Sequence, residues 1–264
     1  MINTHTPEEV SEIVKDVALK MCDHVRRFTT PISVEVDPDW GELVGSGSSI
    51  NKGDQHYLIT NKHVMDDFCD RCGGHHFREN NPEDATSFVA PISRAFASRP
   101  TPADIAVALI PEELWKQEHR NSTSIPIEKF AEQHSPVERE FLFFAGYPQS
   151  GSKSLYRHLV VKALPFTTQS PIPEVELDYP EYDFHLCYPR NSVTCLDNKH
   201  ILAPLASGYS GSLVWNTRFV ETLQEGGEWS PESAVVTGII KRWIDEDGLL
   251  VATRVETRNH RTML

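Results

Sequence analysis

The sequence predicts a mainly β protein that begins with one long helix. Short apolar runs recur along the chain, and 18 prolines separate many of them with turns. Apolar residues at helical spacing extend over a long stretch only at residues 6–28. A length of 264 residues suits one large domain or two small ones, and all-β proteins often reach this size as a single unit.

The helix predicted at residues 6–28 carries its own start signal. Thr6 caps it, Pro7 fits the first turn, and Glu9 completes a capping box. One apolar stripe follows at helical spacing: Val10, Ile13, Val14, Val17, Met21, Val25 and Phe28. The stripe indicates a helix that packs on the body of the protein. A partner-binding or membrane-surface helix is the alternative, although its polar face mixes acidic and basic residues, which argues against lipid.

Beyond residue 30 the apolar pattern changes to that of strands. The first set of strands is predicted at residues 32–36, 40–44, 47–50, 56–60 and 105–110. His63 follows one of these strands, where a rigid element could present it. Asp104 directly precedes another. Because aspartate disfavours strands, it is either a turn residue or a buried group with a dedicated partner.

A polar stretch at residues 66–86 contains two cysteines and two histidines close together, Cys69, Cys72, His75 and His76. The Cys-x-x-Cys spacing suits zinc. A second pair at the expected distance is missing, so we expect a loop without metal, and no cofactor. A zinc site and a thiol redox switch are the alternatives.

A long polar connection at residues 111–140, with a short helix at 112–118, separates two sets of strands. We therefore expect a helical extension at residues 1–30, a first β unit at 31–128 and a second at 129–264. Strands of the second unit are predicted at residues 141–145, 159–164, 182–187, 234–240 and 249–255. An acidic, proline-rich loop is expected at 169–181 and an insertion at 217–232.

A serine turn at residues 207–212 precedes the apolar run at 213–215. Gly208 permits a sharp turn that a side chain would block, and Gly211 is expected to leave room for a substrate. Such a turn exposes the Ser210 hydroxyl. It also aims the backbone N–H groups of Gly208 and Ser210 at one point, as in an oxyanion hole. A serine nucleophile further needs a base and a group that orients the base.

The chain supplies these groups in the order His63, Asp104, Ser210. Their contexts are Tyr-Leu-Ile-Thr-Asn-Lys-His-Val, Asp-Ile-Ala-Val and Gly-Tyr-Ser-Gly-Ser, with Gly-Ser-Gly-Ser-Ser-Ile at residues 45–50. In these motifs the chain resembles the trypsin-like serine peptidases, which have the chymotrypsin fold. It is more similar to bacterial HtrA-like and intracellular members than to secreted digestive enzymes.

The resemblance covers residues 31–256 and includes two supporting segments. Gly146-Tyr147-Pro148 is similar to a turn of the second barrel, and residues 236–239 are similar to the strand that flanks the substrate. The resemblance implies two six-stranded antiparallel β-barrels of the chymotrypsin type, the first with His63 and Asp104 and the second with Ser210.

The resemblance also implies a role for each site residue. Ser210 would attack the scissile carbonyl, His63 would take and return its proton, and Asp104 would hold the imidazole. The N–H groups of Gly208 and Ser210 would bind the oxyanion. The expected function is a serine endopeptidase that acts through an acyl-enzyme on peptides or proteins. A catalytically silent peptide-binding module and an esterase-like hydrolase are the alternatives.

The sequence departs from secreted members of the family in ways that bear on activation and specificity. Tyr209 stands in place of the acid before the serine, and Ser212 in place of the last glycine. The chain opens with a helix rather than an activating cleavage site, so we expect the oxyanion loop to be ordered in another way or by a partner protein. No PDZ-type segment follows residue 256, unlike full-length HtrA proteins.

The primary specificity pocket is expected to involve the segment before the serine and one strand after it. Pro204 occupies the position where trypsin-type enzymes carry an aspartate. The substrate-binding residues would be Pro204, Val236, Thr237 and Gly238. Without an acid at Pro204, a small or apolar substrate residue is expected rather than lysine or arginine.

Charge and composition exclude several other classes. With 25 basic and 38 acidic residues the formal net charge is −13, which does not favour a nucleic-acid partner. No apolar run approaches the roughly 18 residues that span a bilayer, and no secretory signal pattern opens the chain. Five cysteines are not an obvious disulfide framework. We therefore expect a soluble, cytoplasmic protein.

Overall fold

The computed structural model describes residues 6–37, 40–69, 73–77, 88–92, 95–116, 123–151, 153–155, 158–171, 175–194 and 200–256. The helices are α1 (Pro7–Val25), α2 (Lys62–Cys69), α3 (Glu112–Trp115) and α4 (Phe219–Gln224), with 3₁₀ turns η2 (Ile127–Lys129), η3 (Gln149–Gly151), η4 (Arg190–Ser192) and η5 (Pro231–Ser233). The strands in the N-terminal half are β1 (Thr29–Asp37), β2 (Trp40–Lys52), β3 (Gln55–Thr60), β4 (Gly73–Phe77), β5 (Phe88–Pro91), β6 (Phe96–Arg99), β7 (Ile105–Ile110) and β8 (Ile125–Pro126). Those in the C-terminal half are β9 (Leu142–Gly146), β10 (Lys153–Leu155), β11 (His158–Val160), β12 (Leu164–Thr168), β13 (Asp183–Cys187), β14 (Val193–Thr194), β15 (His200–Ile201), β16 (Leu213–Asn216), β17 (Val235–Ile244) and β18 (Leu249–Arg254).

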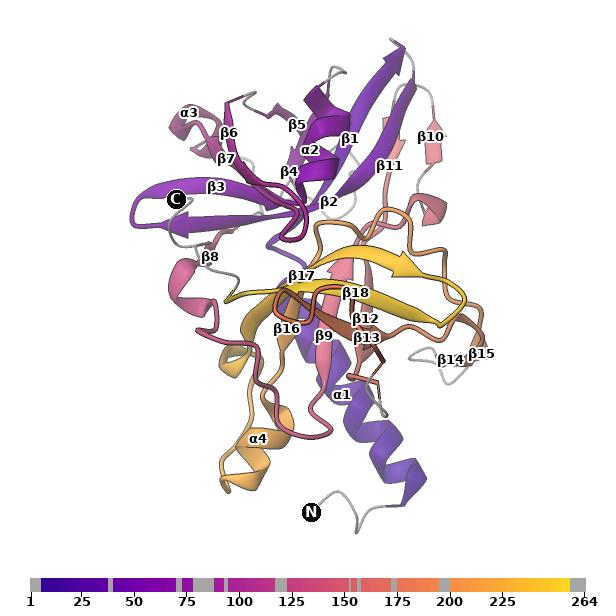
Figure 1. Ribbon diagram of the computed structural model, residues 1–264. Helices are drawn as coiled ribbons and strands as arrows, with labels where there is room; N and C mark the ends of the chain where they lie inside the picture. Colours follow the sequence, from indigo (N-terminus) through magenta and orange to yellow (C-terminus); the bar gives the residue numbers. More distant parts are fainter. Residues whose placement is uncertain are drawn as a thin grey trace.

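Two antiparallel sheets form the body of the protein, one above the other in Figure 1. The first sheet has the strand order β5-β4-β1-β2-β3-β7-β6, and the short β8 pairs in parallel with β2. The second sheet has the order β12-β9-β16-β17-β18-β13. The hairpins β10–β11 and β14–β15 lie outside both sheets.

This architecture confirms the mainly β fold with an N-terminal helix. The described strands of the first sheet come from residues 29–126 and those of the second from 142–254. The second sheet has the six strands expected, whereas the first is divided into eight. The strands predicted at 40–44 and 47–50 are one strand, β2.

The two glycines inside β2 serve close packing rather than a break in the strand. A Cβ on Gly45 would lie 2.8 Å from the Val64 side chain and 3.2 Å from the Ser210 carbonyl. A Cβ on Gly47 would lie 2.9 Å from the Leu58 side chain. Glycine therefore lets β2 approach both α2 and the second half of the chain.

Helix α1 starts as its sequence predicts and packs on the second sheet. The Glu9 amide donates to Thr6 Oγ1 at 3.3 Å, and the Thr6 amide donates to Glu9 Oε2 at 2.8 Å, which completes the capping box. Val17, Met21 and Val25 are buried against β9, β12 and neighbouring segments. None of the helices within the described residues is long and apolar enough to cross a membrane.

One apolar cluster joins the two sheets and α1 into a common core. It contains Val17 and Met21 of α1, Ile50 and Val107 of the first sheet, and Phe143, Trp215 and Ile239 of the second. Two further clusters lie mainly within the first and the second sheet respectively. The surfaces that carry the candidate site are therefore held by a shared core.

His134 lies in this interior and makes the stability of the fold depend on pH. Its Nδ1 lies 2.8 Å from Thr237 Oγ1, and its ring stacks on Phe184 with centroids 3.7 Å apart. Burial, with a smaller contribution from the charge on Arg254, lowers the pKa of His134 from 6.5 to about 3. The folded protein therefore holds this imidazole neutral where the unfolded chain would protonate it.

We expect the free energy of unfolding to fall as the pH drops below 6.5, because the unfolded state binds the extra proton first. The contribution of His134 approaches about 1.4 kcal/mol per pH unit, down to the folded pKa of about 3. Urea unfolding between pH 7 and pH 4 measures this slope. In His134→Asn the slope becomes shallower, whereas Thr237→Val, which keeps the imidazole, retains it. An equal slope in His134→Asn and wild type would contradict the assignment.

Candidate active site

His63 and Asp104 meet because two antiparallel strands bring their ends together. His63 is the second residue of α2, which follows the end of β3, and Asp104 directly precedes β7. β3 and β7 are antiparallel neighbours, with Thr60 opposite Ala106. The end of β3 and the start of β7 are thus adjacent, 41 residues apart in sequence.

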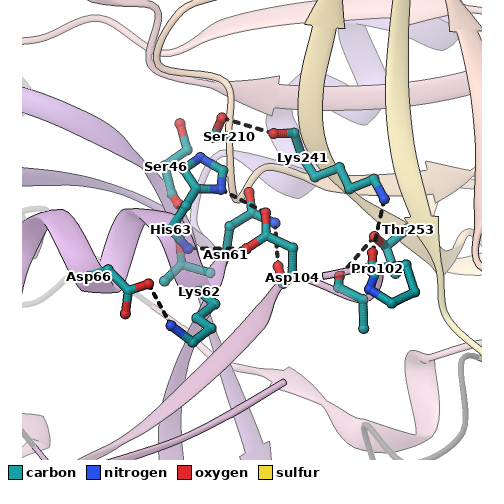
Figure 2. Close-up of polar contacts among 12 residues, drawn as sticks. Ser46, Asn61, Lys62, His63, Asp66, Pro102, Asp104, Ser210, Lys241 and Thr253 are labelled. Atoms are coloured by element: carbon teal, nitrogen blue, oxygen red, sulfur yellow. Dashed lines mark hydrogen bonds and ion pairs between the residues drawn. The ribbon is translucent and has the colours of Figure 1, made fainter. Parts of the chain in front are cut away.

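The Asp104 carboxylate binds His63 at two points. One oxygen lies 2.6 Å from His63 Nδ1, and the other accepts the backbone N–H of His63 at 3.0 Å (Figure 2). The Asp104 side chain is 14% exposed, and that of His63 is 46% exposed. The partly buried Asp104 carboxylate thus binds the Nδ1 edge of the imidazole. The edge with the other ring nitrogen belongs to the accessible part of this half-exposed side chain.

Asp104 adopts a backbone conformation that is uncommon for residues other than glycine. Its φ is +50°, in the left-handed region that Asp and Asn enter more readily than most residues. Its carbonyl accepts a hydrogen bond from Asn61 Nδ2 at 2.8 Å, and its amide donates to Pro100 O at 3.2 Å. Residues 101–104, which we call the aspartate turn, are thereby fixed on the first sheet.

Ser210 lies in the loop that precedes β16, on the second sheet. Its Oγ donates to the carbonyl oxygen of Lys241 at 3.5 Å. Figure 2 draws the His63 ring between the Ser210 side chain and Asp104. Among the described residues no hydrogen bond joins Ser210 Oγ to His63. Such bonds between a serine and its base are often long or absent without substrate.

Two glycines give the serine loop (residues 207–212) its shape. Gly208 has φ +98°, and a Cβ there would lie 2.4 Å from Tyr147 O, as expected of a turn that a side chain would block. Gly211 has φ +89°, and a Cβ there would lie 1.9 Å from Ser46 O. The space beside Gly211 is therefore taken by β2 and not by a substrate, which corrects the role expected for this residue.

We expect Gly211→Ala to destabilise the fold severely, because the added methyl group would overlap a backbone carbonyl. We expect the free energy of unfolding to fall by more than about 4 kcal/mol, which corresponds to a fall of roughly 10 °C in Tm for a protein of this size. Gly226 is the matched control, since its φ is +77° but a Cβ there meets nothing within 4 Å. Comparing the Tm values of Gly211→Ala and Gly226→Ala separates the effect of steric overlap from the effect of backbone strain alone. A similar small loss in both would contradict the close contact.

Backbone amides in the serine loop divide into two groups. Tyr209, Gly211 and Ser212 donate to Ala206 O, Ile240 O and Tyr209 O, at 2.9–3.0 Å. For the amides of Gly208 and Ser210, no acceptor is present among the described residues. The Ser207 amide likewise has no acceptor there, so the two amides expected to bind an oxyanion are among three in this loop without one.

The peptide between Ser207 and Gly208 is held in one orientation by Gln149. The Gln149 amide donates to Ser207 O at 2.8 Å, and its side-chain Oε1 accepts from Ser207 Oγ at 2.6 Å. Gln149 Nε2 in turn donates to Leu43 O on β2 at 2.8 Å. In a planar trans peptide the N–H points opposite to the C=O, so the Gly208 N–H points away from Gln149.

Ser46 on β2 fixes the same loop from the first sheet. Its amide donates to Ser210 O at 2.8 Å, and its hydroxyl donates to Gly208 O at 2.7 Å. The Tyr147 amide donates to that hydroxyl at 2.9 Å, which places the predicted Gly146-Tyr147-Pro148 turn against the serine loop. Ser46 is fully buried, so these bonds are shielded from water.

Tyr209, which stands before the serine, anchors the loop in the core of the second sheet. Its side chain is 1% exposed and packs edge-on against Phe144. Burial raises the pKa of Tyr209 and raises that of the neighbouring Tyr188 to about 12, so both phenols stay protonated near neutral pH. The Tyr188 hydroxyl donates to Pro204 O at 2.9 Å. The residue before the serine thus anchors the loop through an aromatic side chain.

The residues predicted to bind substrate differ in how buried they are. Pro204 is half-buried and precedes the serine loop, with Leu205 47% exposed beside it. Val236 and Thr237 are buried, and Gly238 pairs with β16 and β18 on its two sides. The segment 236–238 thus has no free edge for a peptide. β17 contacts the serine loop further along, where Ile240 bonds Gly211 and Ser212 and the Lys241 carbonyl accepts the Ser210 hydroxyl.

Four residues around the site escaped sequence reasoning: Ser46, Gln149, Asn61 and Lys241. The first three are ordinary polar residues in turns or strands, and only tertiary contacts reveal them. Lys241 did carry a signal, because a lysine follows the apolar run 235–240 within a buried strand.

The possible metal site at Cys69, Cys72, His75 and His76 lies outside the described residues or side chains. In the part of the chain that the structure does describe, no group of three or more histidine, cysteine or acidic side chains could hold a metal ion.

Comparisons with known proteins support the fold. No family model and no curated protein sequence matches the chain. Human heparin binding protein matches with a TM-score of 0.51 at 13% identity, over 87% of this chain and 86% of that chain. Tobacco etch virus protease, complexed with product, matches at 0.41 and 11% identity over 86% and 72% of the two chains. Tobacco vein mottling virus protease matches at 0.43 and 12% over 86% and 76%. We base the fold on the first match: the protein has a chymotrypsin-like fold.

Proposed function

We propose that this protein is a serine endopeptidase. Ser210 is the nucleophile, His63 the general base and Asp104 the group that orients and stabilises the imidazolium. The observation that carries the proposal is the pair of hydrogen bonds from Asp104 to His63, at 2.6 and 3.0 Å, beside a serine loop in which the Gly208 and Ser210 amides have no acceptor among the described residues. A purely structural histidine would not need a dedicated, partly buried carboxylate that leaves the other ring nitrogen free.

The reaction follows from these positions. After Ser210 turns toward His63, the imidazole takes its proton while Oγ attacks the scissile carbonyl. The N–H groups of Gly208 and Ser210 stabilise the oxyanion, and His63 then protonates the leaving amine. Water, activated by the same imidazole, hydrolyses the acyl-enzyme. Each such oxyanion donor is worth roughly a hundred- to a thousand-fold in rate where it has been removed.

A peptide substrate could add to the free edge of β17 beyond Lys241. Residues 242–244 pair with β18 on one side, and on the other side the described residues provide no strand. An extended peptide on this edge would gain main-chain hydrogen bonds and bring its scissile bond toward Ser210.

The proposal is tested by incubating the purified protein with an unstructured polypeptide substrate. We expect cleavage that a serine-directed fluorophosphonate blocks and a metal chelator leaves unchanged. Cleavage that only the chelator blocks would contradict a serine mechanism. It would favour chemistry at a metal site instead.

We also expect substrates with a small or apolar residue before the scissile bond to be preferred. Residues 203–208 carry no charged side chain, so a lysine or arginine would be buried without a partner. Peptides that differ only at this position should show kcat/KM at least about tenfold higher for alanine, valine or leucine than for lysine. A measured preference for lysine or arginine would indicate an acidic side chain in the pocket. It would contradict the expected preference for small or apolar residues.

A catalytically silent peptide-binding module is the second candidate. The observation that favours it is the orientation of Ser210 Oγ toward Lys241 O rather than toward His63. Binding of unstructured peptides with equal affinity by wild type and Ser210→Ala, without turnover of any peptide or small ester by wild type, would support this candidate. The absence of small-ester turnover by wild type would also exclude an esterase-like hydrolase.

The cellular setting is part of the proposal rather than of the fold. We propose a cytoplasmic bacterial peptidase, related to HtrA-like and intracellular trypsin-like enzymes, that acts on peptides or proteins. Neither nucleic acid nor membrane is a proposed partner, given the net charge of −13. Fractionation of cells that express the tagged chain tests the location.

A further inference from the structure

A buried ion pair lies behind the candidate site. Lys241 Nζ on β17 is 2.7 Å from Asp183 Oδ1 on β13, and the two side chains are 7% and 0% exposed. Burial raises the pKa of Asp183, and the charge on Lys241 opposes that effect. Arg242, paired with Asp178, and the Tyr179 ring, 5.7 Å from Lys241 Nζ, lie near the pair, as do His185 and Arg254, whose Nε donates to Asp183 O.

Stability alone gives no reason for charges at this place. The attraction within a buried ion pair often only balances the cost of removing both charges from water, and well-packed apolar residues serve equally well. The ammonium of Lys241, however, makes a second contact that an apolar residue could not make. It donates to Pro102 O at 2.9 Å, across the boundary between the two sheets (Figure 2).

This contact is one of three that hold successive carbonyls of the aspartate turn. Lys241 binds Pro102 O, Thr253 Oγ1 binds Ala103 O at 2.9 Å, and Asn61 Nδ2 binds Asp104 O at 2.8 Å. The first two donors come from the second sheet, and the third, Asn61, lies between β3 of the first sheet and α2. The turn that carries Asp104 is thus gripped from both sheets.

The aspartate turn requires such support because Asp104 is held at φ +50°. Residues persist in this region only when the surrounding structure fixes them. In this conformation one carboxylate oxygen reaches the His63 amide and the other reaches Nδ1. If the turn relaxed, the two-point grip on His63 would be the first contact to change.

We propose that Lys241, held by Asp183, is a positioning residue that fixes the aspartate turn and thereby keeps Asp104 bound to His63. Its role in hydrolysis rests on the proposed peptidase function, but its effect on His63 does not. Lys241 also touches the other arm of the site, since its carbonyl accepts the Ser210 hydroxyl. One residue of β17 therefore contacts both the serine and the aspartate side of the site.

The test removes both charges together, so that no unpaired carboxylate remains buried. In Lys241→Met/Asp183→Leu we expect the Nδ1 proton resonance of His63 to weaken or shift, as measured by NMR. We expect kcat to fall by up to about 100-fold with little change in KM, as for a misplaced catalytic group. Restoring the charges in reverse order, as Lys241→Asp/Asp183→Lys, is not expected to rescue, because the ammonium would no longer reach Pro102.

Lys62→Met is the matched control. It removes a lysine charge next to His63, from an exposed pair with Asp66, without touching the aspartate turn. We expect its His63 Nδ1 proton resonance and its kcat to match those of wild type. A folded double variant whose His63 Nδ1 resonance is that of wild type would overturn the proposal.

Thr253→Val gives a second, milder variant in case the double variant does not fold. It removes only the bond to Ala103 O and keeps the shape of the side chain. We expect a change of the His63 resonance in the same direction but smaller, and an unchanged resonance would overturn the proposal. Because NMR reads His63 directly, a wild-type protein that cleaves nothing would refute the peptidase function while leaving this test intact.

Discussion

Replacement of Ser210 by alanine is expected to lower kcat for peptide hydrolysis by about 10⁶-fold, to the limit of detection. The size of the effect follows from loss of the only nucleophile, since the base and the oxyanion amides cannot form an acyl-enzyme by themselves. Substrate binding should change little, because the substitution removes one oxygen and leaves the loop amides in place. Active-site titration and steady-state kinetics with one peptide measure both quantities.

Ser212→Ala is the matched control for this loss. Ser212 lies in the same loop, two residues further on, but its side chain is fully buried beside Gly146. Its hydroxyl has no hydrogen-bond partner among the described residues, so its removal should leave activity within a few-fold of wild type. Equal activity of wild type and Ser210→Ala would transfer the chemistry to another group.

Asp104→Asn is expected to lower kcat by about 10⁴-fold while the protein stays folded, as the same change does in a serine-protease triad. Asparagine tolerates the left-handed backbone at φ +50° and has the same shape, so the aspartate turn should persist. Its amide group, however, would donate to His63 Nδ1 where the carboxylate accepts. The imidazole would then carry its proton on Nε2 and could not accept one from Ser210.

Asp66→Asn controls for the loss of one negative charge near His63. Asp66 lies on α2 in an exposed pair with Lys62 and does not contact the imidazole. We expect its kcat to remain within a few-fold of wild type, and circular dichroism to show both variants folded. A loss of similar size in Asp66→Asn and Asp104→Asn would indicate a general electrostatic effect, and no specific grip on His63.

The helix and the general fold could be predicted from the sequence because their signals are local. The capping box at Thr6 and the apolar stripe of α1 depend only on neighbouring residues, and both occur in the structure. The division of β2 into two strands was wrong. The predicted strands 40–44 and 47–50 left residues 45 and 46 between them, whereas the lack of a side chain at Gly45 and Gly47 allows contacts with Val64 and Leu58 that the sequence does not display.

Site residues that belong to sequence motifs could be predicted, whereas those that reach the site only through tertiary contacts could not. The structure brings His63 and Asp104 into contact, as their places at strand ends allow. Residues 236–238 were predicted to face the substrate, but the pairing of β17 on both sides buries them. Lys241 and Asp183 lie 58 positions apart and meet across β18, so neither residue alone predicts the pair.

The central claim is that Ser210 is an activated nucleophile, and covalent labelling tests it most directly. Wild-type protein is treated with a fluorophosphonate, with and without cell lysate, and the adduct is located by peptide mass spectrometry. We predict one adduct, on Ser210, that is absent from Ser210→Ala. Labelling only with lysate would identify an activating partner and still place the nucleophile at Ser210. An adduct on another residue, or none under either condition, would contradict the claim.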